Sequence, residues 1–146
     1  MEGAPLDIHF FVYYDRKQKF AMPCQAFSEP VLFCVKSGNF RYRIGDSDWF
    51  IAEENAIVLC PVNTPFCGEI ASPISLVVAK FSTNTPFPVV AHPIYPDTSR
   101  VQDNLEHLSR AGFLLTDQPS HEICHYVTDL YYMARSIIPS SKLPLQ

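Results

Sequence analysis

The sequence predicts a mainly β protein, with a small antiparallel sandwich or barrel followed by two helices. Short apolar runs alternate with turn residues between Leu6 and Phe81, which is the pattern of antiparallel strands. A proline-punctuated stretch follows from Thr85 to Pro96. After it, apolar residues recur at three- and four-residue intervals, which is the period of a helix. This change of period divides the chain into a β-rich part and a helical part.

Seven strands are predicted, each rich in β-branched or aromatic residues. They are Asp7 to Tyr14, Lys19 to Met22, Val31 to Lys36, Phe40 to Ile44, Trp49 to Ala52, Ala56 to Cys60 and Ile74 to Phe81. The clusters Ser37–Asn39 and Gly45–Asp48 provide tight hairpin turns, because Gly and Asn tolerate left-handed backbone. Pro65 falls between two predicted strands, where its missing N–H removes no ladder hydrogen bond.

Two helices are predicted, from Ser99 to Ala111 and from Ser120 to Ile138. Gly112 is placed to end the first helix, and Pro139 to stop the second. Ser120 is a natural N-cap, because its hydroxyl can accept a hydrogen bond from a free N–H of the first turn. The second helix carries an apolar stripe made of Ile123, Val127, Leu130, Tyr131, Ala134, Ile137 and Ile138.

The chain is expected to form one structural domain. Its 146 residues can bury a substantial core. Residues 1–84 are assigned to the barrel, 85–98 to a crossing segment, 99–138 to the two-helix region and 139–146 to a tail or linker. The net charge of -4 argues against the basic face that direct nucleic-acid binding requires.

The five cysteines are odd in number and show no C-x-x-C spacing. They lie within apolar runs, so buried free thiols are expected. No stretch approaches the about 18 apolar residues of a membrane span, and no charged, apolar leader opens the chain. A cytoplasmic protein with no membrane partner is therefore the default expectation.

The stretch from His121 to His125 matches the zinc-protease motif H-E-x-x-H. A zinc site of this kind needs a third ligand, and no Glu or His follows His125 in the sequence. Glu122 also has a structural role, because an acidic residue in the first turn complements the helix dipole. The motif is therefore interpreted as part of an ordinary helix start.

The stretch from Asn55 to Phe66 has the outline of a metal-binding β-barrel motif without its metal ligand. It resembles the second cupin motif, with Asn55 and Asn63 at the glycine positions, Pro61 at the proline and Phe66 at the metal-binding histidine. Asn is one of the few non-glycine residues that adopts left-handed backbone at modest cost. The turns of the motif can therefore form without the glycines.

The first cupin motif, aligned with its closing glycine at Gly38, has lost its ligands as well. The resemblance places its His-x-His pair on Gln25 and Phe27 and its Glu on Val31, while the second motif's His falls on Phe66. Phe and Val side chains carry no donor atom for a divalent cation. The resemblance thus implies no metal, no cofactor and no enzymatic activity.

The sequence from Val31 to Phe81 resembles the N-terminal effector-binding domain of AraC-type transcriptional regulators. The resemblance covers essentially the whole chain. It implies a cupin-like antiparallel β-barrel, or jelly roll, followed by two helices that form a homodimer contact. The implied function is small-molecule sensing in the bacterial cytoplasm, with DNA contacted only through a domain absent from this chain. A free-standing cupin-like protein and a cupin-class enzyme remain alternatives.

The register of the motifs predicts which side chains line a ligand pocket, since strand residues alternate between faces. The predicted lining is Phe33, Val35, Ser37, Tyr42, Phe66, Leu76 and Val78. Lys80 is expected near the rim, and the Tyr42 hydroxyl could contact a ligand oxygen. The alternative is that these side chains fill a solid barrel.

Arg41 and Arg43 flank Tyr42 and are expected on the outer face of their strand, because alternation places them opposite Phe40, Tyr42 and Ile44. An inward turn would instead let them clamp a carboxylate.

The second helix is expected to share its apolar stripe between the barrel and a homodimer seam, since the cluster Tyr131–Met133 is typical of association surfaces. Ligand entry is expected to order the segment Met1 to Asp7 and to shift the pairing of the helices.

Overall fold

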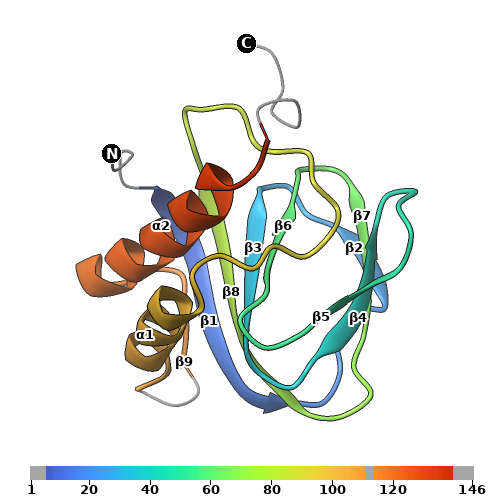
Figure 1. The fold of residues 1–146 in the computed structure, drawn as a ribbon, viewed down its shortest axis with the longest axis horizontal. Coiled ribbons are helices and arrows are strands. Elements are labelled where there is room, and N and C mark those ends of the chain that lie inside the picture. Colours follow the sequence, from blue (N-terminus) through green and yellow to red (C-terminus); the bar gives the residue numbers. More distant parts are fainter. Residues whose placement is uncertain (1–5, 111–113, 140–146) are drawn as a thin grey trace.

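The computed structural model describes residues 6–110 and 114–139, which form two facing antiparallel sheets with two helices on the outer face of the larger sheet (Figure 1). The elements are β1 (Asp7–Lys17), β2 (Cys24–Ala26), β3 (Val31–Ser37), β4 (Phe40–Ile44), β5 (Phe50–Ala52), β6 (Ile57–Cys60), β7 (Pro65–Glu69), β8 (Ile74–Ser82), α1 (Thr98–Ser109), β9 (Leu114–Thr116) and α2 (His121–Ser136). The prediction of a mainly β chain with two helices after the main strands is confirmed.

The two sheets are not joined into a closed barrel. The larger sheet has the strand order β6-β3-β8-β1-β9, and the smaller has the order β2-β7-β4-β5. Among the residues that the structure describes, no hydrogen-bonded ladder connects the two sheets. The observed architecture is therefore a two-sheet sandwich, and the expected barrel closure is absent from the described strands.

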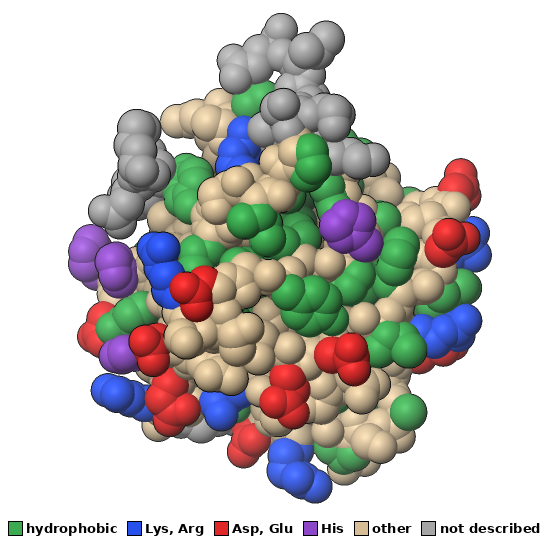
Figure 2. Space-filling view, viewed as in Figure 1, with side chains coloured by type: hydrophobic (Ala, Val, Ile, Leu, Met, Phe, Trp, Pro, Cys, Tyr) green, Lys and Arg blue, Asp and Glu red, His purple; other side chains and the backbone are tan. Residues whose placement is uncertain are grey.

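The crossing segment between β8 and α1 covers the gap between β6 and the smaller sheet. The N–H and C=O groups of Ile94 pair with those of Ile57 in β6, at 2.9 and 2.8 Å. The Tyr42 hydroxyl of β4 donates to the Ala91 carbonyl at 2.6 Å. Single hydrogen bonds from an irregular segment thus replace the ladder that would close a barrel. Figure 2 shows hydrophobic side chains gathered near the centre of the face that this segment crosses.

The strand predictions need correction at four places. The predicted strand Lys19 to Met22 is wrong, because the chain bends there and pairing resumes only at β2. β2, β7 and β9 were not predicted. Pro65 is the first residue of β7, where its missing N–H costs nothing, and its carbonyl accepts a hydrogen bond from the Gly45 N–H at 2.8 Å.

The left-handed turns predicted at the two asparagines are confirmed. Asn55 has φ 73° and Asn63 has φ 54°. Both therefore occupy the backbone region that the cupin-like motif would assign to glycine. The Asn63 N–H donates to the Phe27 carbonyl at 2.8 Å, which links this turn to the segment after β2.

The helix starts are fixed by side-chain caps. The Ser120 hydroxyl accepts a hydrogen bond from the Ile123 N–H at 3.2 Å, so the predicted N-cap is confirmed. α1 begins one residue earlier than predicted, because Asp97 caps it by accepting from the Arg100 N–H at 3.4 Å. Gly112, the predicted helix stop, lies outside the described residues.

Side-chain alternation in the larger sheet creates two separate apolar clusters. In β3, Leu32 and Cys34 face the helices, whereas Val31, Phe33 and Val35 face the smaller sheet. We call the first cluster the helix-side core and the second the inter-sheet core. The register inferred from the cupin-like alignment gave the same two faces for β3.

The helix-side core takes up most of the apolar stripe of α2. The Tyr131 ring is buried and lies 5.2 Å from the Phe81 ring and 6.1 Å from the Phe87 ring, measured between centroids. Met133 is also buried, and Tyr132 packs against the same cluster. Ile137 stays 54% exposed. The stripe assigned in part to a dimer seam is thus largely covered by the chain's own sheet.

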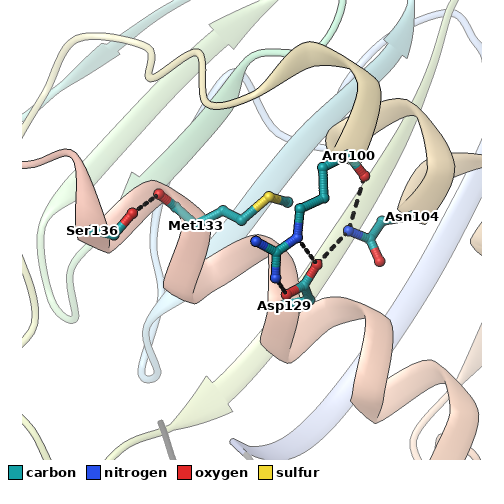
Figure 3. Close-up of polar contacts among 5 residues, drawn as sticks. All are labelled: Arg100, Asn104, Asp129, Met133 and Ser136. Carbon is teal, nitrogen blue, oxygen red and sulfur yellow. Dashed lines mark hydrogen bonds and ion pairs between the residues drawn. The ribbon is translucent and has the colours of Figure 1, made fainter. Parts of the chain in front are cut away.

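A polar network joins the two helices (Figure 3). Arg100 of α1 forms a bidentate ion pair with Asp129 of α2, with its Nε at 3.1 Å from Oδ2. The buried amide of Asn104 donates to the same carboxylate at 2.8 Å and to the Arg100 carbonyl at 3.0 Å. Asp129 therefore holds two side chains of α1 and fixes the contact between the helices.

None of the described helices is both long enough and apolar enough to cross a membrane.

Candidate functional site

A cavity of about 150 Å³ lies at one end of the inter-sheet core. Its wall combines rings and aliphatic side chains with two lysines and one glutamine. The lining residues are Phe10, Val12, Tyr14, Lys17, Phe20, Ala21, Met22, Gln25, Phe27, Phe33, Phe66, Val78 and Lys80. They come from β1, β2, β3, β7 and β8 and from the segment that joins β1 to β2.

An aromatic cluster forms the centre of the cavity wall. The rings of Phe33 and Phe66 are stacked with centroids 4.6 Å apart. Phe27 approaches both of them, at 6.3 and 6.2 Å. Phe20 lies 6.5 Å from Phe33 and 5.8 Å from Phe66. Phe27 and Phe20 therefore both pack against the stacked pair.

Gly68 of β7 gives the Phe20 ring room to approach the sheet. A Cβ atom on Gly68 would lie 2.6 Å from Cε2 of Phe20, well inside the contact distance of two carbons. The Gly68 N–H also donates to the Pro23 carbonyl at 3.0 Å. The segment between β1 and β2 is thus held over the cavity by the backbone hydrogen bond between Gly68 and Pro23 and by packing of the Phe20 ring against Gly68.

Two lysines lie against this aromatic cluster. The Lys17 ammonium is 3.8 Å from the ring centroid of Tyr14 and 5.8 Å from that of Phe20. The Lys80 ammonium is 5.0 Å from the Phe10 centroid and 5.5 Å from the Phe27 centroid. Cation–π contacts of this kind stabilise an ammonium group beside apolar rings.

Neither lysine forms an ion pair with an acidic side chain in the described part of the chain. The cavity wall itself contains no Asp or Glu among these residues. Partial burial lowers the pKa of Lys17, since the charged form loses solvation there. The chain as a whole is acidic, so this cavity is a locally cationic site in a protein of opposite net charge.

The structure divides the predicted pocket residues into three groups. Those that line the cavity are Phe33, Phe66 and Val78, with Lys80 beside them. Those buried deeper in the inter-sheet core are Val35, Tyr42 and Leu76. Ser37 is exposed at the end of β3 and lies away from the cavity, because the chain is already turning toward Gly38.

The Tyr42 hydroxyl, which the sequence analysis considered as a contact for a ligand oxygen, donates a hydrogen bond to the Ala91 carbonyl. Burial raises the pKa of this hydroxyl, so it stays protonated and acts as a donor. The carbonyl belongs to the crossing segment, whose path the sequence pattern did not specify. Tyr42 therefore links the smaller sheet to the crossing segment.

The four positions that correspond to cupin metal ligands lie near the same cavity. Gln25, Phe27 and Phe66 line it, and Val31 is buried in the inter-sheet core beside it. In β2 and β7, Gln25 pairs directly with Phe66. Only the amide of Gln25 offers a donor atom, which is too few for a metal site. Among the described residues, no three His, Cys, Asp or Glu side chains are grouped to bind a metal ion.

The H-E-x-x-H sequence lies outside this cavity, on the exposed first turns of α2. His121 and His125 are exposed, and Glu122 occupies the first turn. The ring of His125 contacts Tyr126 at 5.2 Å, and Tyr126 stacks on His107 of α1 at 4.5 Å. These side chains thus belong to the helix surface.

The expectation of five free thiols is wrong for two of them. Cys24 and Cys67 form a disulfide between β2 and β7, where they are direct cross-strand partners. Cys34 and Cys60 are buried free thiols, and burial raises the pKa of Cys60 to about 12. Cys124 is half-buried and free. The bonded pair is 43 residues apart, so only the strand pairing brings the two sulfurs together.

Arg41 lies on the outer face of the smaller sheet. Its guanidinium donates to the Glu69 carboxylate at 2.9 Å and lies 4.1 Å from the Trp49 ring centroid. Arg43 is half-buried, and its Nε has no hydrogen-bond partner among the described residues. Neither arginine lines the inter-sheet cavity.

Sequence reasoning missed the contribution of β1 to the cavity. Phe10, Val12 and Tyr14 recur at every second position, so they share one strand face. The two-residue period was visible in the sequence. Which face of the sheet these side chains occupy could not be assigned without knowing the partner strand. Lys17 and Phe20 lie beyond the predicted end of the strand and carried no comparable signal.

Comparisons with known proteins give no family assignment. No protein-family description and no curated protein sequence matches the chain. A crystal structure of protein NMB1881 from Neisseria meningitidis is similar over 56% of this chain and 88% of its own, with 14% identity and a TM-score of 0.43. The structure of Drosophila melanogaster CENP-C bound to CAL1 is similar over 51% of this chain and 65% of its own, with 13% identity and a TM-score of 0.39. Neither likeness carries an argument about function.

Proposed function

We propose that this chain binds a small organic molecule in the cavity between its two sheets. The observation that carries the proposal is the cavity wall, in which aromatic rings surround two lysines that have no acidic partner among the described residues. Ligand sites are typically apolar pockets in which a few polar groups orient the ligand. The absence of a metal-ligand set in the cavity wall favours binding over metal-assisted catalysis.

In this proposal the chain is the sensory domain of an AraC-type regulator, with a cupin-like sandwich and helices that mediate a homodimer. The support comes from the sequence resemblance and from the order of the parts, since two helices follow the main strands as in that family. DNA would be contacted by a separate domain. The exposed Ile137 and the partly exposed Tyr132 of α2 are the apolar side chains that such a dimer contact could use.

A physical route for sensing exists because the same strands contribute to both cores. Phe33 lines the cavity, while its neighbours Leu32 and Cys34 pack under the helices. In β8, Val78 lines the cavity and Val77 faces the helix-side core. A ligand that binds two arrangements of these strands with different affinities would shift the helices as well.

The test is a thermal-shift screen of the chain against a metabolite library, with and without divalent metal ions. A metal-independent rise in melting temperature with one chemical class is expected, because a ligand that binds only the folded state stabilises it by mass action. Stabilisation by metal ions alone, or by no compound, would overturn the proposal.

A matched pair of variants places the binding site. Val78→Phe adds a ring inside the cavity, and Val62→Phe makes the same change at an exposed turn. We expect the first variant to lose the ligand-induced shift and the second to keep it. Equal shifts in both variants would place the ligand elsewhere on the molecule.

A further inference from the structure

We infer that the ligand is a compact aromatic carboxylate, whose ring lies against Phe33 and Phe66 and whose carboxylate pairs with Lys17 or Lys80 at one side of these rings. This inference rests on the proposed small-molecule function of the cavity and names the chemical class of the ligand. Its three supports are the volume of the cavity, the kind of wall and the placement of charge.

The volume limits the apolar part of the ligand to about one ring. The cavity measures about 150 Å³. Apolar protein cavities of about that size bind benzene. A bicyclic ring system or a long acyl chain would extend beyond this volume. Phe20 and Phe27 both line this cavity and pack against Phe33.

The wall favours an aromatic body over an aliphatic one. A planar ligand ring can pack edge-to-face or offset against Phe33 and Phe66, whose own rings are nearly parallel with an interplanar angle of 12°. Phe27 and Phe20 meet Phe33 at steep angles, 61° and 89°. A flat ligand between such rings gains aromatic contact on its face and on its edges.

The charge of the wall favours an anion. Three described cations, Lys36, Arg41 and Arg100, have acidic partners. Lys17 and Lys80 instead lie over aromatic rings. A carboxylate in the cavity would supply the missing counter-ion in a partly desolvated place, where a charge-assisted hydrogen bond contributes most. A cationic ligand would be repelled by both ammonium groups.

Gln25 offers a further contact for the ligand head group. It lies in β2, is partly exposed and lines the same cavity. Its amide carries two donors and one acceptor, so it can donate to a carboxylate without adding charge. The described polar groups of the wall thus include three possible donors to an anion, from Lys17, Gln25 and Lys80.

The experiment compares benzoate with benzamide, which has nearly the same shape and no charge, by isothermal titration calorimetry. We expect benzoate to bind at least about tenfold more tightly, because only benzoate can form a charge-assisted hydrogen bond with a lysine. Laurate is the size probe and is expected to bind more weakly than benzoate. Tighter binding of laurate would overturn the size argument.

Three lysine variants assign the charge contact. Lys17→Gln and Lys80→Gln each remove one cation of the cavity, while Lys19→Gln removes a nearby exposed lysine that does not line it. At least one cavity variant should lower benzoate affinity about tenfold and leave benzamide affinity unchanged. Lys19→Gln should change neither. Melting temperatures of the unliganded variants verify that each one is folded.

The outcomes separate this inference from the proposed function. If benzoate and benzamide bind equally and Val78→Phe removes both, the cavity binds small molecules but the anion inference is overturned. If benzoate binds more tightly but is unaffected by Lys17→Gln and by Lys80→Gln, the assigned contact is wrong. If no compound binds in the thermal-shift screen or in the calorimetric comparison, the proposed function itself fails.

Discussion

The helix-side core and the inter-sheet core lie on opposite faces of one sheet, yet they are built from different side chains. The helix-side core is mostly aliphatic and is covered by α1 and α2, whose contact is fixed by the Asp129 network. The inter-sheet core is rich in phenylalanine, and one end of it opens into the cavity. The comparison shows that the helices cover the first core, whereas a cavity remains at one end of the second.

This difference has a physical basis in the partners of each face. Helices can shift and rotate until aliphatic side chains interdigitate, which produces dense packing. The strands of the smaller sheet are hydrogen-bonded to one another, and Tyr42 donates to the crossing segment. The cavity lies where aromatic side chains of the two sheets meet.

The largest expected effect is in the helix-side core. Leu130→Ala removes a fully buried side chain of α2 and should lower the free energy of unfolding by about 3 kcal/mol, since it creates a cavity in dense packing. Val78→Ala, at the existing cavity, should cost only about 1.5 kcal/mol. Chemical denaturation measures both values. An equal or larger loss for Val78→Ala would contradict the difference between the cores.

Removal of the disulfide should have the next largest effect and should act on the inter-sheet side. The double variant Cys24→Ser/Cys67→Ser should lose about 2–3 kcal/mol, because the unfolded chain regains the freedom of a long closed loop. Hydrogen exchange should rise around Gln25 and stay unchanged in α2.

Alkylation of the unfolded protein tests the disulfide directly. Without reductant, three cysteines should react, and after reduction all five should react. Five reactive cysteines without reductant would show that the bond does not form under those conditions.

A smaller effect is expected from the polar network between the helices. Asp129→Asn removes the charge that holds Arg100 and Asn104, and should cost about 1–2 kcal/mol. Asp103→Asn is the matched control, because Asp103 is exposed on α1 and forms no ion pair among the described residues. Equal losses in the two variants, measured by urea denaturation, would contradict a specific role of Asp129.

The smallest effect concerns His9 at the start of β1, where the ring contacts Glu29 and Asp7. The hydrogen bond with Glu29, followed by the one with Asp7, raises the pKa of His9 above 6.5. Because the folded-state pKa is the higher one, the stabilisation is complete below pH 6.5 and is lost as the pH rises through the folded-state value.

His9→Gln should therefore reduce the melting temperature more at about pH 5.5 than at about pH 8.5. His125→Gln, an exposed change with no acidic partner in the described chain, should show no such difference. A His9 effect that is independent of pH would contradict the ion-pair interpretation.

Much of the fold was predictable because its signals are local. Short apolar runs between turn residues identified β1, β3, β4 and β8, and the Ser120 cap identified the start of α2. The inward face of β3, with Phe33, followed from one motif alignment. β7 was missed because it begins with Pro65 and contains Gly68, two residues that ordinarily mark turns.

The cavity was only partly predictable. Phe33 and Val78 were identified from strand faces and Phe66 from the motif alignment, but Lys17 and Phe20 reach the cavity from beyond the predicted end of β1. The hydrogen bond from the Tyr42 hydroxyl to the crossing segment was not predicted, because the sequence pattern does not specify the path of that segment. Such assignments depend on which distant segments meet, and a period along the chain contains no such information.

The sequence by itself determined the element types, the two faces of the main strands and the left-handed turns at Asn55 and Asn63, because these follow from interactions between near neighbours in the chain. The tertiary structure decided the Cys24–Cys67 bond, the closure of the sandwich by the crossing segment and the placement of Lys17 and Lys80 around one cavity. Each of these joins residues far apart in the sequence. Their proximity depends on strand pairing and on packing of the whole chain, which no local pattern specifies.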